Sequence, residues 1–217
     1  HTHTHTHTHT HATLRRVAGR GVAKQVCQNG VLAAGTYGVE VNGVDDKEWL
    51  KLQKISGAAT ASCVAGRSLT ATLLLHGDLT WKAGVAPAAR WQKEVWRATA
   101  NEAQRIGNNG RDDDNGKGAL ETDGEECDLA ETCNKPAAFS YDELVSHWET
   151  ANKESHSWYR SNGEAKWKAT RGPTGATVLS LDRIGWKAEA ADIWISDAGV
   201  RYDLKEFSPA MFSKHLH

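Results

Sequence analysis

Two runs of neighbouring carboxylates are the residues of this 217-residue chain whose types could support catalysis. Asp45 and Asp46 are adjacent, and Asp112, Asp113 and Asp114 form a triplet. Carboxylates grouped in this way can hold two divalent cations for phosphoryl transfer when strands position them. The first pair precedes KEWLKLQKI, which has helical spacing, and the triplet lies in a polar, Gly-rich stretch. We therefore interpret Asp45 or Asp46 as a helix cap and predict no catalytic residue.

A basic stripe belongs to the helix that this cap predicts. Lys47, Lys51 and Lys54 recur at spacings of four and three, so they share one helical face. The residues of the predicted apolar face recur at a spacing of three and are Trp49, Leu52 and Ile55. We expect the helix to end at Gly57, in a left-handed conformation. Two interpretations of the lysines stay open, a solvated face and contact with a phosphate backbone.

A second helix, predicted over Leu14–Asn29, carries further cations on its exposed side. They are Arg15, Arg16, Arg20 and Lys24. With the three lysines they form the candidate nucleic-acid-binding set, because two helices could present all seven to one phosphate backbone. Residues 12–105 contain 13 Lys and Arg against 7 Asp and Glu, whereas residues 106–136 contain 3 against 9. A basic first half suits a domain that faces nucleic acid, and it also occurs in ordinary helical domains.

The stretch VLAAGTYGVEVNGVDDKEWLKLQKISG resembles the segment that follows the catalytic palm in LINE-type (non-LTR) retroelement reverse transcriptases. In that family a helical thumb begins near a Leu-Tyr-Gly turn. The residues that carry the resemblance here are Val31, Leu32, Tyr37, Gly38, Glu40, Leu50, Leu52, Gln53, Ile55 and Gly57. Arg67–Trp96 and Arg171–Trp186 resemble the downstream region of a divergent protist branch of the same family. The resemblance covers most of Arg15–Trp96 and Phe139–Leu216.

This resemblance implies an RNA-directed DNA polymerase as the parent protein, and a template- or primer-contacting role for this region. The family's palm has an aromatic-x-Asp-Asp turn between two strands, whereas the nearest match here, Gly43-Val44-Asp45-Asp46, begins with glycine. We therefore predict a non-catalytic fragment that is inactive alone. Its expected partner is RNA or an RNA–DNA duplex, bound weakly and without sequence preference. The alternative is a decayed or domesticated small interaction module that does not bind nucleic acid.

The remaining metal-binding residue types give no metal site. Residues 1–11 alternate His and Thr, a pattern that binds Zn, Cu or Ni adventitiously and that a translated CA-dinucleotide repeat also produces. Nothing apolar lies there to be buried, so we expect disorder. The four cysteines, Cys27, Cys63, Cys127 and Cys133, form no C-x-x-C pair. We predict no metal and no cofactor.

The hydropathy of the chain bears on its location. No run approaches the roughly 18 apolar residues of a membrane helix, and no basic–apolar–small leader is present. We therefore expect an intracellular protein, nuclear or cytoplasmic, that is not secreted and has no membrane partner. The oligomeric state is left open.

The periodicity predicts a mainly α fold with a small β-hairpin. The expected parts are a disordered His-Thr repeat (1–11), a helical thumb- or connection-like domain (12–105), a flexible acidic linker (106–136) and a small Trp-rich α+β domain (137–217). The further helices are predicted over Ser68–His76, Pro87–Ala103 with Pro87 as first residue, Tyr141–Tyr159, Gly175–Ile184 and after Ser208-Pro209. The hairpin Asp192–Leu204 is expected to turn at Asp197-Ala198-Gly199 and to alternate Ile193 and Ile195 against Val200 and Tyr202. Five of the nine tryptophans lie in the last third, as a base-stacking platform or as core.

Overall fold

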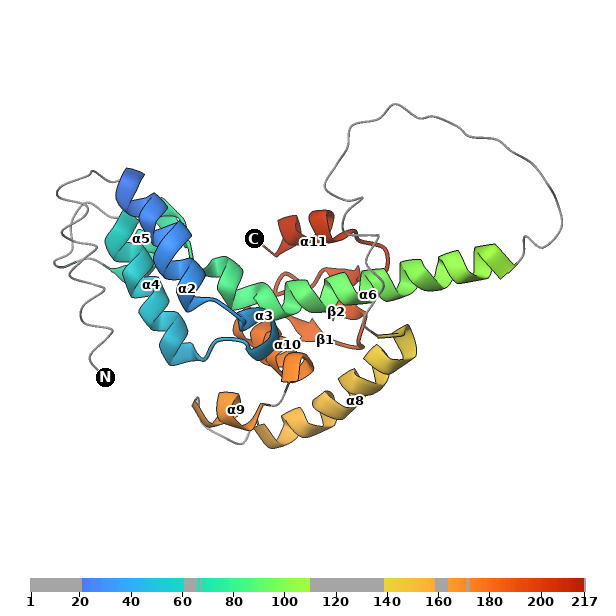
Figure 1. Ribbon diagram of the computed structural model, residues 1–217. Helices are drawn as coiled ribbons and strands as arrows, with labels where there is room; N and C mark the ends of the chain where they lie inside the picture. Colours follow the sequence, from blue (N-terminus) through green and yellow to red (C-terminus); the bar gives the residue numbers. More distant parts are fainter. Residues whose placement is uncertain are drawn as a thin grey trace, which may run out of the picture.

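The computed structural model describes residues 21–60, 66, 68–109, 139–158, 164–170 and 172–216. This part of the chain is mainly helical and has a small three-stranded antiparallel sheet, which confirms the predicted fold class (Figure 1). In chain order the elements are η1 (Cys27–Leu32), α2 (Ala33–Gly35), α3 (Val39–Asn42), α4 (Asp46–Thr60), α5 (Leu69–His76), α6 (Trp81–Asn109), α8 (Tyr141–Trp158), α9 (Glu164–Ala169), α10 (Gly172–Arg183), β1 (Lys187–Ala188), β2 (Ile193–Ile195), β3 (Arg201–Asp203) and α11 (Pro209–His215). The His-Thr repeat, Arg15, Arg16, Arg20, most of the predicted acidic linker and three of the four cysteines lie outside the described residues.

The first described helix continues past Asn29, its predicted end. Residues 21–26, η1 and α2 form one helix, in which η1 is a π-helical turn, and the helix ends after Gly35. Cys27 and Leu32 are buried in the smaller of the two main cores, so packing extends the helix beyond its local signals. The predicted Tyr-Gly turn follows, with Gly38 at a φ of 77°.

Helix α4 also runs further than predicted, to Thr60 instead of Gly57. Gly57 is helical and buried, together with Ser56 and Ala59. Small side chains on this face allow neighbouring segments to approach closely, and the Ser56 hydroxyl accepts a hydrogen bond from the Leu79 N–H at 3.3 Å. The glycine therefore serves packing and does not end the helix.

Helix α6 begins at Trp81, so the prediction of Pro87 as its first residue is wrong. The missed start signal is Asp78, whose carboxylate accepts hydrogen bonds from the N–H and the hydroxyl of Thr80 at 2.8 and 2.6 Å. Pro87 is buried inside the helix, where its missing N–H removes one backbone hydrogen bond. The Thr177 hydroxyl of α10 donates to the Pro87 carbonyl at 3.1 Å, and this contact holds α10 against the proline turn.

The larger core contains buried residues of α6, α8, α10, the sheet and α11. Figure 1 shows α6 crossing the molecule, with α11 on one side and α8 on the other. The predicted segments 12–105 and 137–217 therefore share one core, because α6 belongs to the first segment and its packing partners to the second.

Tryptophans fill the centre of this larger core. Trp148, Trp186 and Trp194 are at most 7% exposed, and the Trp148 and Trp194 rings lie 6.2 Å apart. Trp91 of α6 lies 5.2 Å from Trp148, whereas Trp96 is only half-buried. Base stacking needs an exposed ring face, so the core interpretation is confirmed for these buried rings.

The predicted hairpin is present and turns as expected, with the Gly199 N–H donating to the Ser196 carbonyl at 2.9 Å. Its inward face is different. Trp194 pairs with Tyr202, and these two side chains are buried, whereas Val200 is exposed. An indole buries more apolar area than an isoleucine, so the strand turns Trp194 inward. The sheet also contains a third strand, β1, which pairs with β2. The sequence analysis did not predict this strand, because two residues are too few to show an alternating pattern.

The other predicted helices are close to those observed. Ser68 caps α5 and Ser208 caps α11, each accepting a hydrogen bond from the N–H three residues later. Helix α8 is described over Tyr141–Trp158, and the predicted last residue, Tyr159, lies outside the described residues; α10 begins at Gly172, three residues before Gly175. These elements have strong local signals, which is why the sequence locates them.

Candidate functional site

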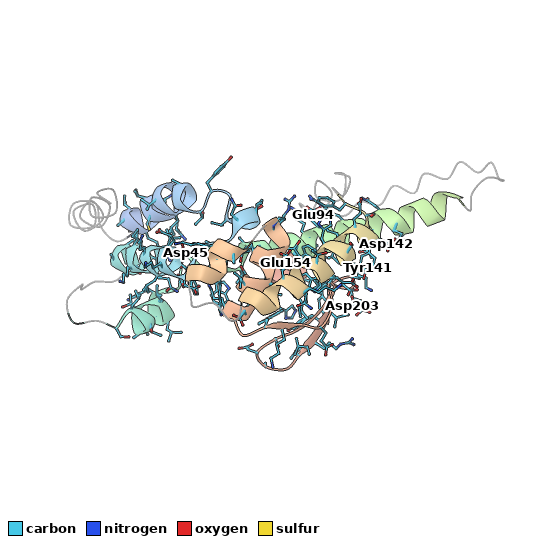
Figure 2. All side chains as sticks on the ribbon, turned by 90° about the horizontal axis from the view of Figure 1, so that it is seen from below. Asp45, Glu94, Tyr141, Asp142, Glu154 and Asp203 are labelled. Carbon is cyan, nitrogen blue, oxygen red and sulfur yellow. The ribbon has the colours of Figure 1, made fainter. Side chains whose placement is uncertain are left out.

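The two adjacent aspartates at the start of α4 both have structural roles. The Asp45 carboxylate accepts the Glu48 N–H at 2.8 Å, which confirms the predicted helix cap. The Asp46 carboxylate accepts from the Arg183 guanidinium at 2.6 Å. Figure 2 shows Asp45 well apart from Glu94 and Asp203, so these labelled carboxylates do not converge. Among the described residues, no group of three or more His, Cys, Asp or Glu side chains could hold a metal ion.

Helix α4 brings three predicted residues onto one face. Lys47, Lys51 and Lys54 lie within one narrow stripe at 3.6 residues per turn. Lys47 and Lys54 are exposed, and the Lys51 side chain is 43% exposed and paired with Glu48. The carboxylates of the first turn are thus engaged, Glu48 with Lys51 and Asp46 with Arg183. Asp45, the third carboxylate at this end of α4, is the helix cap and accepts the Glu48 N–H.

The other predicted cations are only partly placed. Lys24 is exposed on the first described helix, which contacts α4 through η1 (Figure 1). Arg15, Arg16 and Arg20 lie outside the described residues. The structure therefore places the three α4 lysines on one surface and Lys24 on the adjacent helix.

A buried arginine fixes the direction of the lysine face. The Arg183 side chain of α10 is 7% exposed and lies between the rings of Trp49 and Trp167, 4.7 Å from each ring centroid. This double cation–π contact, together with the ion pair to Asp46, holds the first turns of α4 against α10. Burial lowers the pKa of the Arg183 guanidinium, and the hydrogen bond to Asp46 opposes that shift. The sequence analysis did not identify this contact, because Asp46 and Trp49 are more than a hundred residues from Arg183.

A cavity of about 720 Å³ opens between α3, α6, α8 and α10. Its walls include Val41, Trp91 and Leu144, and the Glu94 carboxylate lies among them. Glu94 pairs with Arg90 at 2.8 Å and with Arg97 at 3.0 Å, so two guanidinium groups offset its charge. The cavity has the size of a small-molecule site. The lining of the cavity comes from four segments that are distant in sequence, so no single stretch of sequence predicts it.

A polar cluster of Tyr141, Asp192 and Lys205 connects α8 to the sheet. The Tyr141 hydroxyl donates to the Asp192 carboxylate at 2.7 Å, and the Lys205 ammonium binds the same oxygen at 2.6 Å. Burial of Asp192 acts to raise its pKa, but the hydrogen bonds from Lys205 and Tyr141 outweigh it, so the pKa lies below its ordinary value. The pKa of Lys205 is raised, chiefly by its hydrogen bond to Asp192. The cluster stays charged at neutral pH and ties three segments together.

Comparison with known proteins finds no family model that matches this chain, and no curated protein and no solved structure matches it. The described helices include none that is long and apolar enough to cross a membrane. The lysine face of α4 is therefore the candidate site that both the sequence and the described geometry support.

Proposed function

We propose that this chain is a non-catalytic part of a reverse-transcriptase-like protein and contacts the phosphate backbone of RNA or an RNA–DNA duplex. The observation that carries the proposal is the lysine face of α4, with Lys47, Lys51 and Lys54 on one side of a helix held by a buried arginine. Lysines on a helix face bind phosphates without reading bases, so the binding is independent of sequence. A nucleic-acid partner of this kind implies a nuclear or cytoplasmic location.

The experiment measures binding of the full chain to a labelled RNA–DNA duplex across a salt series at pH 8. The histidines of residues 1–11 are neutral at this pH and add no positive charge. The test variant combines Lys47→Gln with Lys54→Gln, the two exposed lysines of the face. We expect the slope of log affinity against log salt to fall by about one unit per lysine. Adding Lys51→Gln should lower it further.

The matched control combines Lys153→Gln on α8 with Lys187→Gln on β1, which removes the same charge from two exposed positions elsewhere. Its salt slope should stay within about half a unit of the unchanged chain. Equal slopes for the two double variants, or no binding at low salt, would reject the proposal.

A second candidate is an interaction module that binds protein and not nucleic acid. The observation in its favour is helix α5, where Leu74 and Leu75 are 81% and 80% exposed. Exposed apolar side chains that lie together are a feature of surfaces that contact other proteins. Absence of RNA binding at low salt would favour this alternative over the lysine face.

A further inference from the structure

We propose a second binding site, in the groove between α6 and α11, for an extended chain of phosphate groups. The groove has a volume of about 370 Å³. Its α6 wall includes Lys82, Arg90 and Lys93, and its α11 wall includes Ser213 and Leu216. None of these residues belongs to the lysine face of α4, so the site is separate from the proposed function.

The helix geometry gives the groove two cations in line. Lys82 and Lys93 are eleven residues apart, close to three full turns, so they lie on the same face of α6. Between them the groove is lined by small apolar residues, Val85, Ala86 and Ala89. These short side chains leave the floor open to a ligand that reaches both lysines.

The segment that contains α11 is held against α6 by two hydrogen bonds whose donors do not line the groove. The Trp81 indole N–H donates to the Leu216 carbonyl at 2.6 Å, and the Gln92 amide donates to the Phe207 carbonyl at 2.6 Å. Phe212 of α11 is buried in the larger core. The two walls therefore form a preorganised groove.

The charges favour an anion. Arg90 binds Glu94 at 2.8 Å and lies 4.0 Å from Glu40, the one carboxylate among the described residues of the lining. Among the described residues, neither the Lys82 nor the Lys93 ammonium group forms a hydrogen bond or an ion pair. Two lysine ammonium groups in one groove thus lack a counter-charge.

The spacing identifies the ligand as a chain of phosphates. Eleven residues separate the lysine Cα atoms by about 16 Å along α6. One phosphate group is too small to occupy both ends, whereas consecutive phosphates of a single RNA strand, or of inorganic polyphosphate, can contact each lysine in turn. These two sources present the same chemistry to the groove.

The test titrates the full chain with short-chain inorganic polyphosphate by calorimetry at pH 8 and low salt. Orthophosphate serves as the single-phosphate comparator. We expect Lys82→Gln with Lys93→Gln to weaken polyphosphate binding about tenfold, whereas the control Lys153→Gln with Lys187→Gln should change it less than about twofold. Circular dichroism confirms that each variant is folded.

A second arm uses a labelled oligouridylate and measures anisotropy. If the groove variant weakens both probes, the ligand is a nucleic-acid strand, and if it weakens polyphosphate alone, the ligand is free polyphosphate. The inference is overturned if polyphosphate does not bind, if orthophosphate binds as tightly, or if the groove variant binds polyphosphate as tightly as the control variant does. Loss of the α4 effect on duplex binding would reject the proposed function and leave this result unaffected.

Discussion

At the scale of single residues, Trp167 determines the geometry of the link that leads into α4. Its ring contacts Arg183 on one side, and its edge reaches the backbone of Gly43, between α3 and α4. Gly43 has a φ of 68°, where residues other than glycine are strained. The orientation of α4 therefore depends on a glycine that lies before the helix and outside the lysine face.

The first prediction concerns this glycine. A Cβ atom at Gly43 would overlap the Trp167 ring, so Gly43→Ala must displace the ring as well as strain the backbone. We expect a loss of about 2–4 kcal/mol in the free energy of unfolding, measured in urea. The smaller side chain of Trp167→Ala should offset part of this loss in the double variant.

A matched glycine separates the two causes. Gly199 has a φ of 79°, and a Cβ atom there would meet nothing within 4 Å. Gly199→Ala should cost about 1 kcal/mol, the backbone strain alone. Equal losses at Gly43 and Gly199 would show that the Trp167 contact adds nothing.

At the scale of elements, local signals located most of the fold. The caps at Asp45, Ser68 and Ser208 are short-range hydrogen bonds that depend on three or four neighbouring residues, so sequence alone predicts them. The lysine stripe of α4 follows from the same helical periodicity. The sequence can therefore predict that candidate site residues lie on one face when they belong to the same helix.

The errors arise where tertiary contacts outweigh local preference. Pro87 lies inside α6 because its ring is buried in the core and Thr177 of α10 binds its carbonyl, and no neighbour of Pro87 in sequence indicates these contacts. Trp194 turns inward because the core behind the sheet accommodates an indole. The Arg183 contact and the α6–α11 groove join distant segments, so spacing along the chain cannot reveal them.

The second prediction concerns the cluster that joins α8 to the sheet. Because the pKa of Asp192 is lower in the folded chain than in the unfolded chain, its charge stabilises the fold above the unfolded pKa. That stabilisation is lost as the pH falls below about 4, where the unfolded carboxyl binds a proton first. Asp192→Asn should therefore destabilise the chain at pH 7 and matter progressively less on acidification.

Urea unfolding between pH 3 and pH 7 measures this difference. The control is Asp142→Asn at the start of α8, where the carboxylate is exposed. We expect its effect to stay below about 1 kcal/mol, the size of a helix-dipole contribution. A penalty for Asp192→Asn that grows as the pH falls would contradict the lowered pKa of this carboxyl in the folded chain.

At the scale of the whole molecule, α6 connects the two main cores. Ala83 near its start belongs to the smaller core, whereas Trp91 and Val95 belong to the larger one. The packing of α3 and α4 thus depends on α6, and the later turns of α6 pack on α8, α10 and α11. Residues 106–136 differ from their neighbours in their polar and charged composition. The larger core nevertheless contains residues from both sides of this segment.

The final prediction tests this dependence by cutting the chain between α6 and α8. A specific protease site inserted after residue 120 would divide the chain into one piece that ends with α6 and another that begins before α8. Because Trp91 and Val95 complete the core around Trp148 and Trp194, we expect the two pieces to stay associated in size-exclusion chromatography and to unfold in one transition. The isolated second piece should expose apolar surface and bind a hydrophobic dye, whereas the cut complex should not. Two pieces that separate and each unfold cooperatively would show that residues 12–105 and 137–217 are independent domains, and that the contacts of α6 with α8 and α10 are weak.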